Sequence, residues 1–326
     1  MSGLKRILAV LDGTDADAVI VSKAVALAHQ QGADLELFLC DAERAYFLLH
    51  AYDSTGVEAA RRGCIRKARH YLESLRDAVA GAGVPIRVDA VCDSPLFEGI
   101  VRKVLRSRCD LVIKNAGSRY PSHRRIWDAN DWQLMRACPA TLLLSRGKSW
   151  QASPRFAAAV DVSSQETAEL PEEILRTSRL LADGCHGQLE VLYSEPCAIE
   201  STTHQRHVAA LQALTDSAGL SGADIRVLSG AAEEALPDFA AGRGYDAFVM
   251  GALTHREDLS SQVGTLTAKL VETLDCDFVL VKPTSYQSQI GPGAPMFGEE
   301  PEFEAARQPQ RDRVPDFVSP WQLPGR

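Results

Sequence analysis

The strongest constraint on the fold is an internal repeat, because the chain passes twice through the same order of predicted strands and helices. Each copy opens with a short aliphatic run that ends at an aspartate, at 7–11 before Asp12 and at 156–160 before Asp161. Each copy is roughly 140 residues long, which is near the usual size of one globular domain. The 326 residues therefore predict two related domains rather than one large domain.

Short aliphatic runs alternate with helical patterns inside each copy. In the first copy we expect a helix over 15–31, capped by Asp15, and an amphipathic helix over 57–79. Strands are expected at 7–11, 35–40, 86–91, 110–114 and 140–144, and in the second copy at 156–160, 189–193, 225–228, 246–250 and 276–281. The closing strands are aligned through Cys138 and Cys276. This alternation predicts two tandem α/β domains, each a doubly wound, five-stranded parallel sheet.

The sequence after the second copy differs in kind. We expect a first domain over 1–147, a second over 155–283, and a tail over 284–326. The tail holds seven of the 16 prolines and shows neither a helical nor an alternating period, so we expect it to be disordered. Two aromatic residues between prolines, within 314–321, would suit either a short docking motif or an inert tail.

Charge and hydropathy argue against two classes of partner. The 43 Asp and Glu outnumber the 35 Lys and Arg, and a net charge of -8 opposes the phosphate-tracking surface that nucleic-acid binding uses. No apolar run approaches the roughly 20 residues of a membrane span, and Asp12 interrupts the N-terminal run early. We therefore expect a cytoplasmic protein with neither a nucleic-acid nor a membrane partner. The eight cysteines include no C-x-x-C pair, so we expect buried thiols rather than disulfides or a zinc site.

Chemistry is expected in the loops that follow the strands, since doubly wound sheets bind ligands where the strand order reverses. In the second copy this edge would carry Asp161, Gly251 and the pair Gly264–Thr265 at a helix start. A strand-end glycine lets the backbone approach a ligand, and a Gly-Thr helix start offers N–H groups and a hydroxyl to an anion. Phosphate is the natural ligand, although turn geometry and capping alone would account for the same residues.

Two common nucleotide motifs are missing. The sequence contains no G-x-x-x-x-G-K-[ST] loop, and no G-x-G-x-x-G turn follows the first strand of either copy. Conventional kinase, ATPase and dehydrogenase chemistry is therefore not expected.

Four strand motifs carry a resemblance to a known family: Ile7–Asp12 (ILAVLD), Asp110–Lys114 (DLVIK), Asp246–Gly251 (DAFVMG) and Cys276–Pro283 (CDFVLVKP). In this order and spacing the chain resembles the universal stress protein family, and within it the proteobacterial members with two tandem domains. The resemblance covers about residues 4–283. It implies a flavodoxin-like fold for each domain and dimerisation through the last strand, so that 141–144 and 279–282 would pair as an internal pseudo-dimer. A homodimer stays open.

Some members of that family bind ATP through the motif G-x2-G-x9-G-[ST], whereas others bind no nucleotide. On the second copy the motif falls on Gly251, Thr254, Gly264 and Thr265. The resemblance further places Asp161 by the ribose and metal, Ser194 on the adenine side and Thr267 at the phosphate-facing cap. Thr254 stands where the motif has glycine, and a strained β-branched residue there would cost roughly 1–3 kcal/mol and weaken nucleotide binding.

The first copy departs further from the motif. Asn115 stands where Gly251 does, and residues 126–132 replace the Gly-[ST] turn without a glycine. We therefore expect that the first domain does not bind ATP in the manner of the family. Three arginines of the same loop could hold another anion or be solvated: Arg119, Arg124 and Arg125.

Catalytic and metal-binding side chains are not evident. His204 and His207, three residues apart on a predicted helix, fit either one side of a metal site or an ordinary surface pair. Ser163 and its neighbouring serine lack an identifiable base, so nucleophilic catalysis has no support.

These observations lead to the hypothesis of a stress-response protein that binds an adenine nucleotide, such as ATP, in its second domain and also binds a protein partner. We expect it to act by binding rather than by catalytic turnover. Two alternatives stay open. One is a slow nucleotide hydrolase with a metal held by Asp161, and the other is a carrier for a small apolar ligand beside Tyr193 and Leu253.

Overall fold

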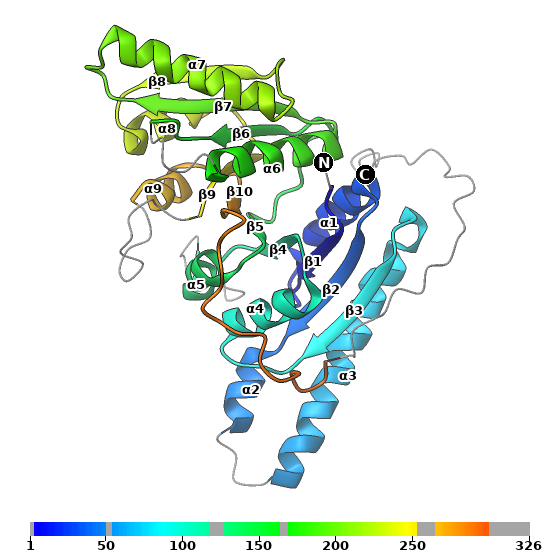
Figure 1. The fold of residues 1–326 in the computed structure, drawn as a ribbon. Coiled ribbons are helices and arrows are strands. Elements are labelled where there is room, and N and C mark those ends of the chain that lie inside the picture. Colours follow the sequence, from blue (N-terminus) through cyan, green and yellow to red (C-terminus); the bar gives the residue numbers. More distant parts are fainter. Residues whose placement is uncertain (1–2, 50–53, 118–126, 164–168, 253–264, 300–326) are drawn as a thin grey trace.

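One continuous sheet runs through the molecule. The computed structural model describes residues 3–49, 54–117, 127–163, 169–252 and 265–299. Across these residues the strands lie in the order β3-β2-β1-β4-β5-β10-β9-β6-β7-β8. Strands β1–β5 form the first half and β6–β10 the second, and neighbouring strands within each half are parallel (Figure 1). The predicted tandem of doubly wound, five-stranded α/β units is confirmed.

The elements lie close to their predicted positions. The strands are β1 Arg6–Val10, β2 Asp34–Cys40, β3 Ile86–Val91, β4 Leu111–Asn115, β5 Thr141–Ser145, β6 Arg155–Ala159, β7 Gln188–Glu195, β8 Asp224–Ser229, β9 Ala247–Gly251 and β10 Asp277–Val281. The helices are α1 Asp17–Gln31, α2 Ala42–Leu49, α3 Ser54–Ala78, α4 Leu96–Ser107, α5 Ala129–Ala137, α6 Glu169–Cys185, α7 Ser201–Ser217, α8 Ala232–Ala240 and α9 Thr265–Thr273. Helices α1, α3, α6 and α7 pack on one face of the sheet, and α4, α5, α8 and α9 pack on the other.

The start of helix α1 is held by a buried carboxylate. The expectation that Asp15 caps this helix is wrong, because the N-cap position falls one residue later and has no side-chain cap. Asp17 instead accepts the N–H of Asp12 at 3.2 Å, the N–H of Gly13 at 2.8 Å and the Tyr71 hydroxyl at 2.8 Å. Burial raises the pKa of Asp17 to about 6. The loop after β1 is therefore fixed by an internal acid.

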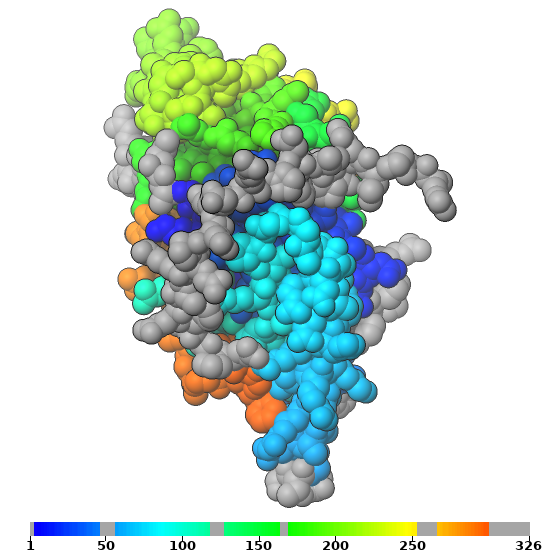
Figure 2. All heavy atoms as spheres, turned by 90° about the vertical axis from the view of Figure 1, so that its right-hand side faces the viewer, coloured from blue at the N-terminus to red at the C-terminus, as the bar shows by residue number. Residues whose placement is uncertain are grey.

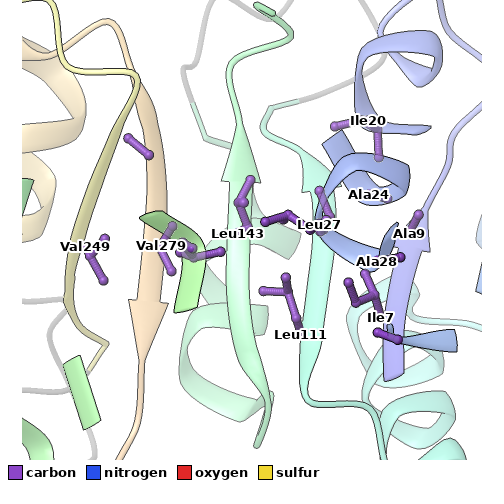
Figure 3. Close-up of a cluster of buried hydrophobic side chains, with 14 of the residues drawn as sticks. Ile7, Ala9, Ile20, Ala24, Leu27, Ala28, Leu111, Leu143, Val249 and Val279 are labelled. Carbon is purple, nitrogen blue, oxygen red and sulfur yellow. The ribbon is translucent and has the colours of Figure 1, made fainter. Parts of the chain in front are cut away.

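The two halves are joined through their last strands. Strand β10 pairs antiparallel with β5, with Val279 opposite Leu143. Figure 3 shows Val249, Val279 and Leu143 on neighbouring strands, with Leu27 of α1 packed against the same cluster. Each half alone would expose one of these strands as an unpaired, apolar edge, and their pairing removes that edge.

The alignment of the closing strands through Cys138 and Cys276 is two residues out of register. In the structure Asp277 of β10 corresponds to Thr141 of β5. Asp277 pairs with the first residue of β9, and Thr141 pairs with the first residue of β4. A shift of two residues leaves every side chain on the same face of a strand, so hydropathy alone does not detect it.

A buried ion pair crosses the junction between the halves. The Lys23 ammonium on α1 donates to Asp277 at 2.5 Å and to the Ser145 hydroxyl at 2.7 Å, and Lys23 is 0% exposed. The indole of Trp150, in the connection between the halves, also donates to Asp277 at 2.7 Å. Each buried charge thus has an opposite charge and at least one further hydrogen-bond partner inside the protein, which a buried ion pair requires.

Breaking this pair should destabilise the whole chain. In Asp277→Asn the buried Lys23 loses its counter-charge, and we expect the free energy of unfolding in urea to fall by about 3–5 kcal/mol. The double variant Lys23→Met with Asp277→Asn should lose less than the sum of the two single variants. Asp183→Asn, which removes an exposed partner of Arg179, is the control and should change stability by less than about 1 kcal/mol. Equal effects of Asp277→Asn and Asp183→Asn would contradict this role.

Residues 284–299 form a C-terminal clasp on the first half, so the prediction of disorder from Thr284 onward is wrong for this part. The clasp leaves β10, passes α5 and α4, and ends beside β3 and α3 (Figure 1). Figure 2 shows the orange end of the clasp against the blue surface of α3. Residues 300–326, the remainder of the predicted tail, lie outside the described residues.

Both ends of the clasp are fixed by specific contacts. At its start the Ser285 N–H and hydroxyl each donate to Glu169 of α6, at 2.8 Å. At its end the Cys92 N–H donates to the Phe297 carbonyl at 3.1 Å, which extends the sheet beyond the outer strand β3. Arg106 of α4 donates to Glu299 at 2.8 Å. The clasp therefore covers the end of an otherwise exposed edge strand.

Gly298 is the residue on which clasp docking should depend. Its φ is +93°, and an added Cβ would lie 2.3 Å from Ile65 Cδ1 and 3.0 Å from the Ala90 carbonyl. We expect Gly298→Ala to release the end of the clasp and to speed hydrogen exchange of the Cys92 amide at least tenfold, or about 1.4 kcal/mol. Gly291→Ala lies in the same segment, has no atom within 4 Å of the new Cβ and should leave that exchange unchanged. An unaltered Cys92 amide in Gly298→Ala would show that the clasp contact is dispensable.

Candidate functional site

The carboxyl edge of the second half brings together three of the predicted site positions. Strand β6 lies between β9 and β7, and the direction of the strand order reverses between β9 and β6. Asp161 follows β6, Gly251 ends β9 and Ser194 lies near the end of β7. These three residues therefore occupy neighbouring strand ends at the point where doubly wound sheets bind ligands.

Asp161 is exposed and shapes the loop that follows it. Its Oδ1 accepts the Ser163 N–H at 2.9 Å and the Ser163 hydroxyl at 2.7 Å. The first half repeats this geometry, since Oδ1 of Asp12 accepts the Thr14 N–H at 3.1 Å and the Thr14 hydroxyl at 2.6 Å. The strand-end aspartates are thus equivalent, and both organise a local turn.

Ser194 and Gly251 have structural partners of their own. The Ser194 hydroxyl donates to the Gly230 carbonyl at 2.8 Å, which ties the end of β7 to the loop after β8. A Cβ on Gly251 would lie 2.9 Å from Leu170 Cδ2, so a larger residue there would have to displace the Leu170 side chain of helix α6. Ser194 therefore has a packing role at the place where the adenine was expected.

The remaining predicted residues of the motif lie at or before the start of α9. Thr267 is in the first turn of this helix and is 5% exposed. Thr254 and Gly264 lie outside the described residues, as does the side chain of Thr265, whose backbone begins α9. The structure thus places Asp161, Ser194, Gly251 and Thr267, and it leaves the phosphate turn itself a prediction.

The corresponding turn of the first half is filled by a buried ion pair. Asp131, in the first turn of α5, is 0% exposed, and its Oδ1 accepts the Lys114 ammonium at 2.8 Å. Its Oδ2 accepts the Gly117 N–H at 2.6 Å and the Asp128 N–H at 3.0 Å. Asn115, which replaces the strand-end glycine, ends β4 next to this pair. The three loop arginines named above, Arg119, Arg124 and Arg125, lie outside the described residues.

A cluster of ionisable side chains at the end of β7 was missed in the sequence. Glu195, nearly buried, contacts Nδ1 of His204 and lies 3.3 Å from Nδ1 of His207. The Tyr193 hydroxyl lies 3.0 Å from the same His207 nitrogen. The sequence spacing indicates the two histidines, but Glu195 is brought to them only by the packing of α7 on the sheet.

Three further features of the described residues bear on metal binding, thiol chemistry and membrane insertion. Among the described residues, no group of three or more His, Cys, Asp or Glu side chains could hold a metal ion. All eight cysteines are described and all are free thiols, and Cys197 is exposed. In the parts of the chain that the structure covers, no helix is long and apolar enough to cross a membrane.

Comparison with known proteins agrees with the fold and the repeat. Residues 3–146 match the model of the universal stress protein family. Over 308 residues the chain is 24% identical to universal stress protein E of Escherichia coli strain K12, covering 89% of this chain and 98% of that protein.

Two solved structures support the fold alone. A functionally unknown protein from Pseudomonas aeruginosa PAO1 is 20% identical with a TM-score of 0.66, covering 86% of this chain and 93% of its own. A universal stress protein from Archaeoglobus fulgidus is 11% identical with a TM-score of 0.60, covering 85% of this chain and 98% of its own.

The Glu195 cluster predicts a pH-dependent contribution to stability. Burial alone would raise the pKa of Glu195, but hydrogen bonds from His204 and His207 outweigh it and lower the pKa below its ordinary 4.5. The contribution is therefore present above pH 4.5 and is lost as the pH falls below that value. We expect Glu195→Gln to lower the urea midpoint at neutral pH, and its difference from the parent to shrink as the pH falls below 4.5.

An exposed glutamate provides the control for this comparison. Glu272→Gln on α9 should leave the urea midpoint within error of the parent across the same pH range. A destabilisation by Glu195→Gln that is constant with pH would show that the carboxylate charge is not what stabilises the cluster.

Proposed function

We propose that the chain is a member of the universal stress protein family in its tandem two-domain form, and that it is a stress-response protein whose second half binds an adenine nucleotide. The nucleotide phosphates would lie at the start of α9, on the backbone N–H groups of Gly264 and Thr265. Asp161, at the adjacent strand end, would face the ribose.

The observation that carries this proposal is the contrast between equivalent turns of the two halves. In the first half the Asp131 carboxylate accepts the N–H of Asp128 at the start of α5 and the N–H of Gly117 in the loop after β4. In the second half the matching position is Thr267, and Met250 stands where the first half has Lys114. Neither residue carries a charge, so the second half lacks both members of this buried ion pair.

The proposed function is binding of the nucleotide without its hydrolysis. Both described hydrogen bonds of Asp161 hold its own loop, through the Ser163 N–H and hydroxyl. The histidines of the Glu195 cluster lie beyond β7, on the side of β6 away from β9 and α9, so they are not placed beside the proposed phosphates.

A protein partner remains part of the proposal and is assigned to the first half. Helix α2 and the beginning of α3 extend past the strands of the sheet and form a projecting arm (Figure 1). Such an arm offers backbone and side chains that the remainder of the described fold does not cover.

Calorimetric titration of the full chain with ATP, ADP and AMP tests the proposed site. We expect one nucleotide per chain. Gly264→Val should weaken binding at least tenfold, or about 1.4 kcal/mol, because a β-branched side chain would block the approach of the phosphate. Ala129→Val, at the position of the first half that corresponds to Thr265, is the control and should leave the affinity unchanged.

Two outcomes would reject the proposal in different ways. Absence of binding at millimolar nucleotide would remove the site altogether. Steady release of ADP and phosphate during the titration, abolished by Asp161→Asn, would replace binding with slow hydrolysis.

A further inference from the structure

The strands and helices around the turn before helix α5 recur in the second half at a constant separation in the sequence. Strands β4 and β9, helices α5 and α9, and strands β5 and β10 each begin 136 residues apart, at Leu111 and Ala247, Ala129 and Thr265, and Thr141 and Asp277. The same distance relates Asp131 to Thr267 and Asp128 to Gly264. The two turns can therefore be aligned residue by residue, without a gap.

The Asp131 carboxylate lies in the turn that corresponds, at the 136-residue spacing, to the turn carrying the motif in the second half. It accepts the N–H of Asp128, the counterpart of the motif glycine Gly264, at 3.0 Å, and the N–H of Gly117 in the loop after β4 at 2.6 Å. Backbone N–H groups that converge at the start of a helix form a site that favours an anion. In the first half that anion is supplied by the chain itself.

A cation completes this arrangement. Lys114 lies at the end of β4, is 5% exposed and donates to Asp131 at 2.8 Å and to the Asn115 carbonyl at 2.7 Å. An ammonium group beside converging N–H groups is a common arrangement for holding phosphate. The second half has Met250 at the corresponding position, so the lysine and the carboxylate occur together in one half and are both replaced in the other.

We propose that Asp131 is an internal substitute for a phosphate, and that its carboxylate closes the turn before α5 to phosphate-bearing ligands. A capping box accounts for part of this geometry, since Asp128 and Asp131 also bond reciprocally at the helix start. It does not account for the bond from Gly117 or for the buried lysine. The inference concerns the first half and stands independently of nucleotide binding in the second.

The inference predicts that removal of the carboxylate creates an anion site. In Asp131→Ala the Lys114 ammonium and the two N–H groups lose their partner, so the full chain should become less stable. Inorganic phosphate should then restore stability by binding at the same place. We expect 50 mM potassium phosphate to raise the Tm of Asp131→Ala by about 4 °C or more over potassium chloride of equal ionic strength, and to leave the parent chain unchanged.

A second buried aspartate provides a matched control. Asp89 on β3 is 1% exposed and accepts the Lys103 ammonium at 2.8 Å, but it lies within a strand rather than at a helix start. Asp89→Ala should be destabilised without any specific response to phosphate. The double variant Lys114→Met with Asp131→Thr, which carries the residues of the second half, should respond less than Asp131→Ala because it lacks the ammonium group.

The phosphate responses of these variants either support or overturn the inference. A phosphate response in Asp131→Ala that exceeds those of Asp89→Ala and the double variant supports the inference. Equal responses in Asp131→Ala and Asp89→Ala would overturn it and leave Asp131 as a capping residue with an ion pair. If Asp131→Ala does not fold, the same comparison is made with Asp131→Ser, whose short side chain also vacates the position of the carboxylate.

Discussion

The antiparallel pairing of β5 with β10 is the constraint on which the remainder of the structure depends. It converts two five-stranded units, each with an apolar strand at one edge, into a single sheet with no such edge between them. The Lys23–Asp277 ion pair sits at this junction, so the correct pairing of the strands also satisfies two buried charges. A slipped or separated junction would leave both charges without partners, which is far more costly than loss of an exposed ion pair. The clasp adds a second connection, from the end of β10 to the outer strand of the first half.

This junction leaves the ligand-binding edges of the two halves free to diverge. In the first half, the loop after β1 is held by Asp17 and the turn before α5 by Asp131, so buried acids satisfy the N–H groups at both places. In the second half Asp161 is exposed, and Thr267 replaces the buried acid of the turn. This difference supports the proposal that the first half makes structural or partner contacts and that the second half binds a phosphate-bearing ligand.

Sequence patterns were sufficient for the parts of the fold that depend on local periodicity, and insufficient for contacts between distant segments. The aliphatic runs and strand-end aspartates predict both sheets, but the two-residue slip at Asp277 preserves the inward face and so is invisible to hydropathy. The clasp has no helical or alternating period, because contacts with side chains of α3, α4 and α6 hold it rather than a regular ladder of backbone hydrogen bonds. The role of Asp131 is apparent only from its buried contacts with Lys114 and with the N–H groups of Gly117 and Asp128. Glu195 meets His204 and His207 only through the packing of α7.

The central claim is that the two halves differ in which anion their helix-start turns accept. A crystal structure of the full chain grown with millimolar ATP measures this most directly. The account predicts nucleotide density with its phosphates at the start of α9, and an Asp131 carboxylate that still accepts the N–H groups of Gly117 and Asp128. Nucleotide at the start of α5, with Asp131 displaced from those N–H groups, would contradict the account.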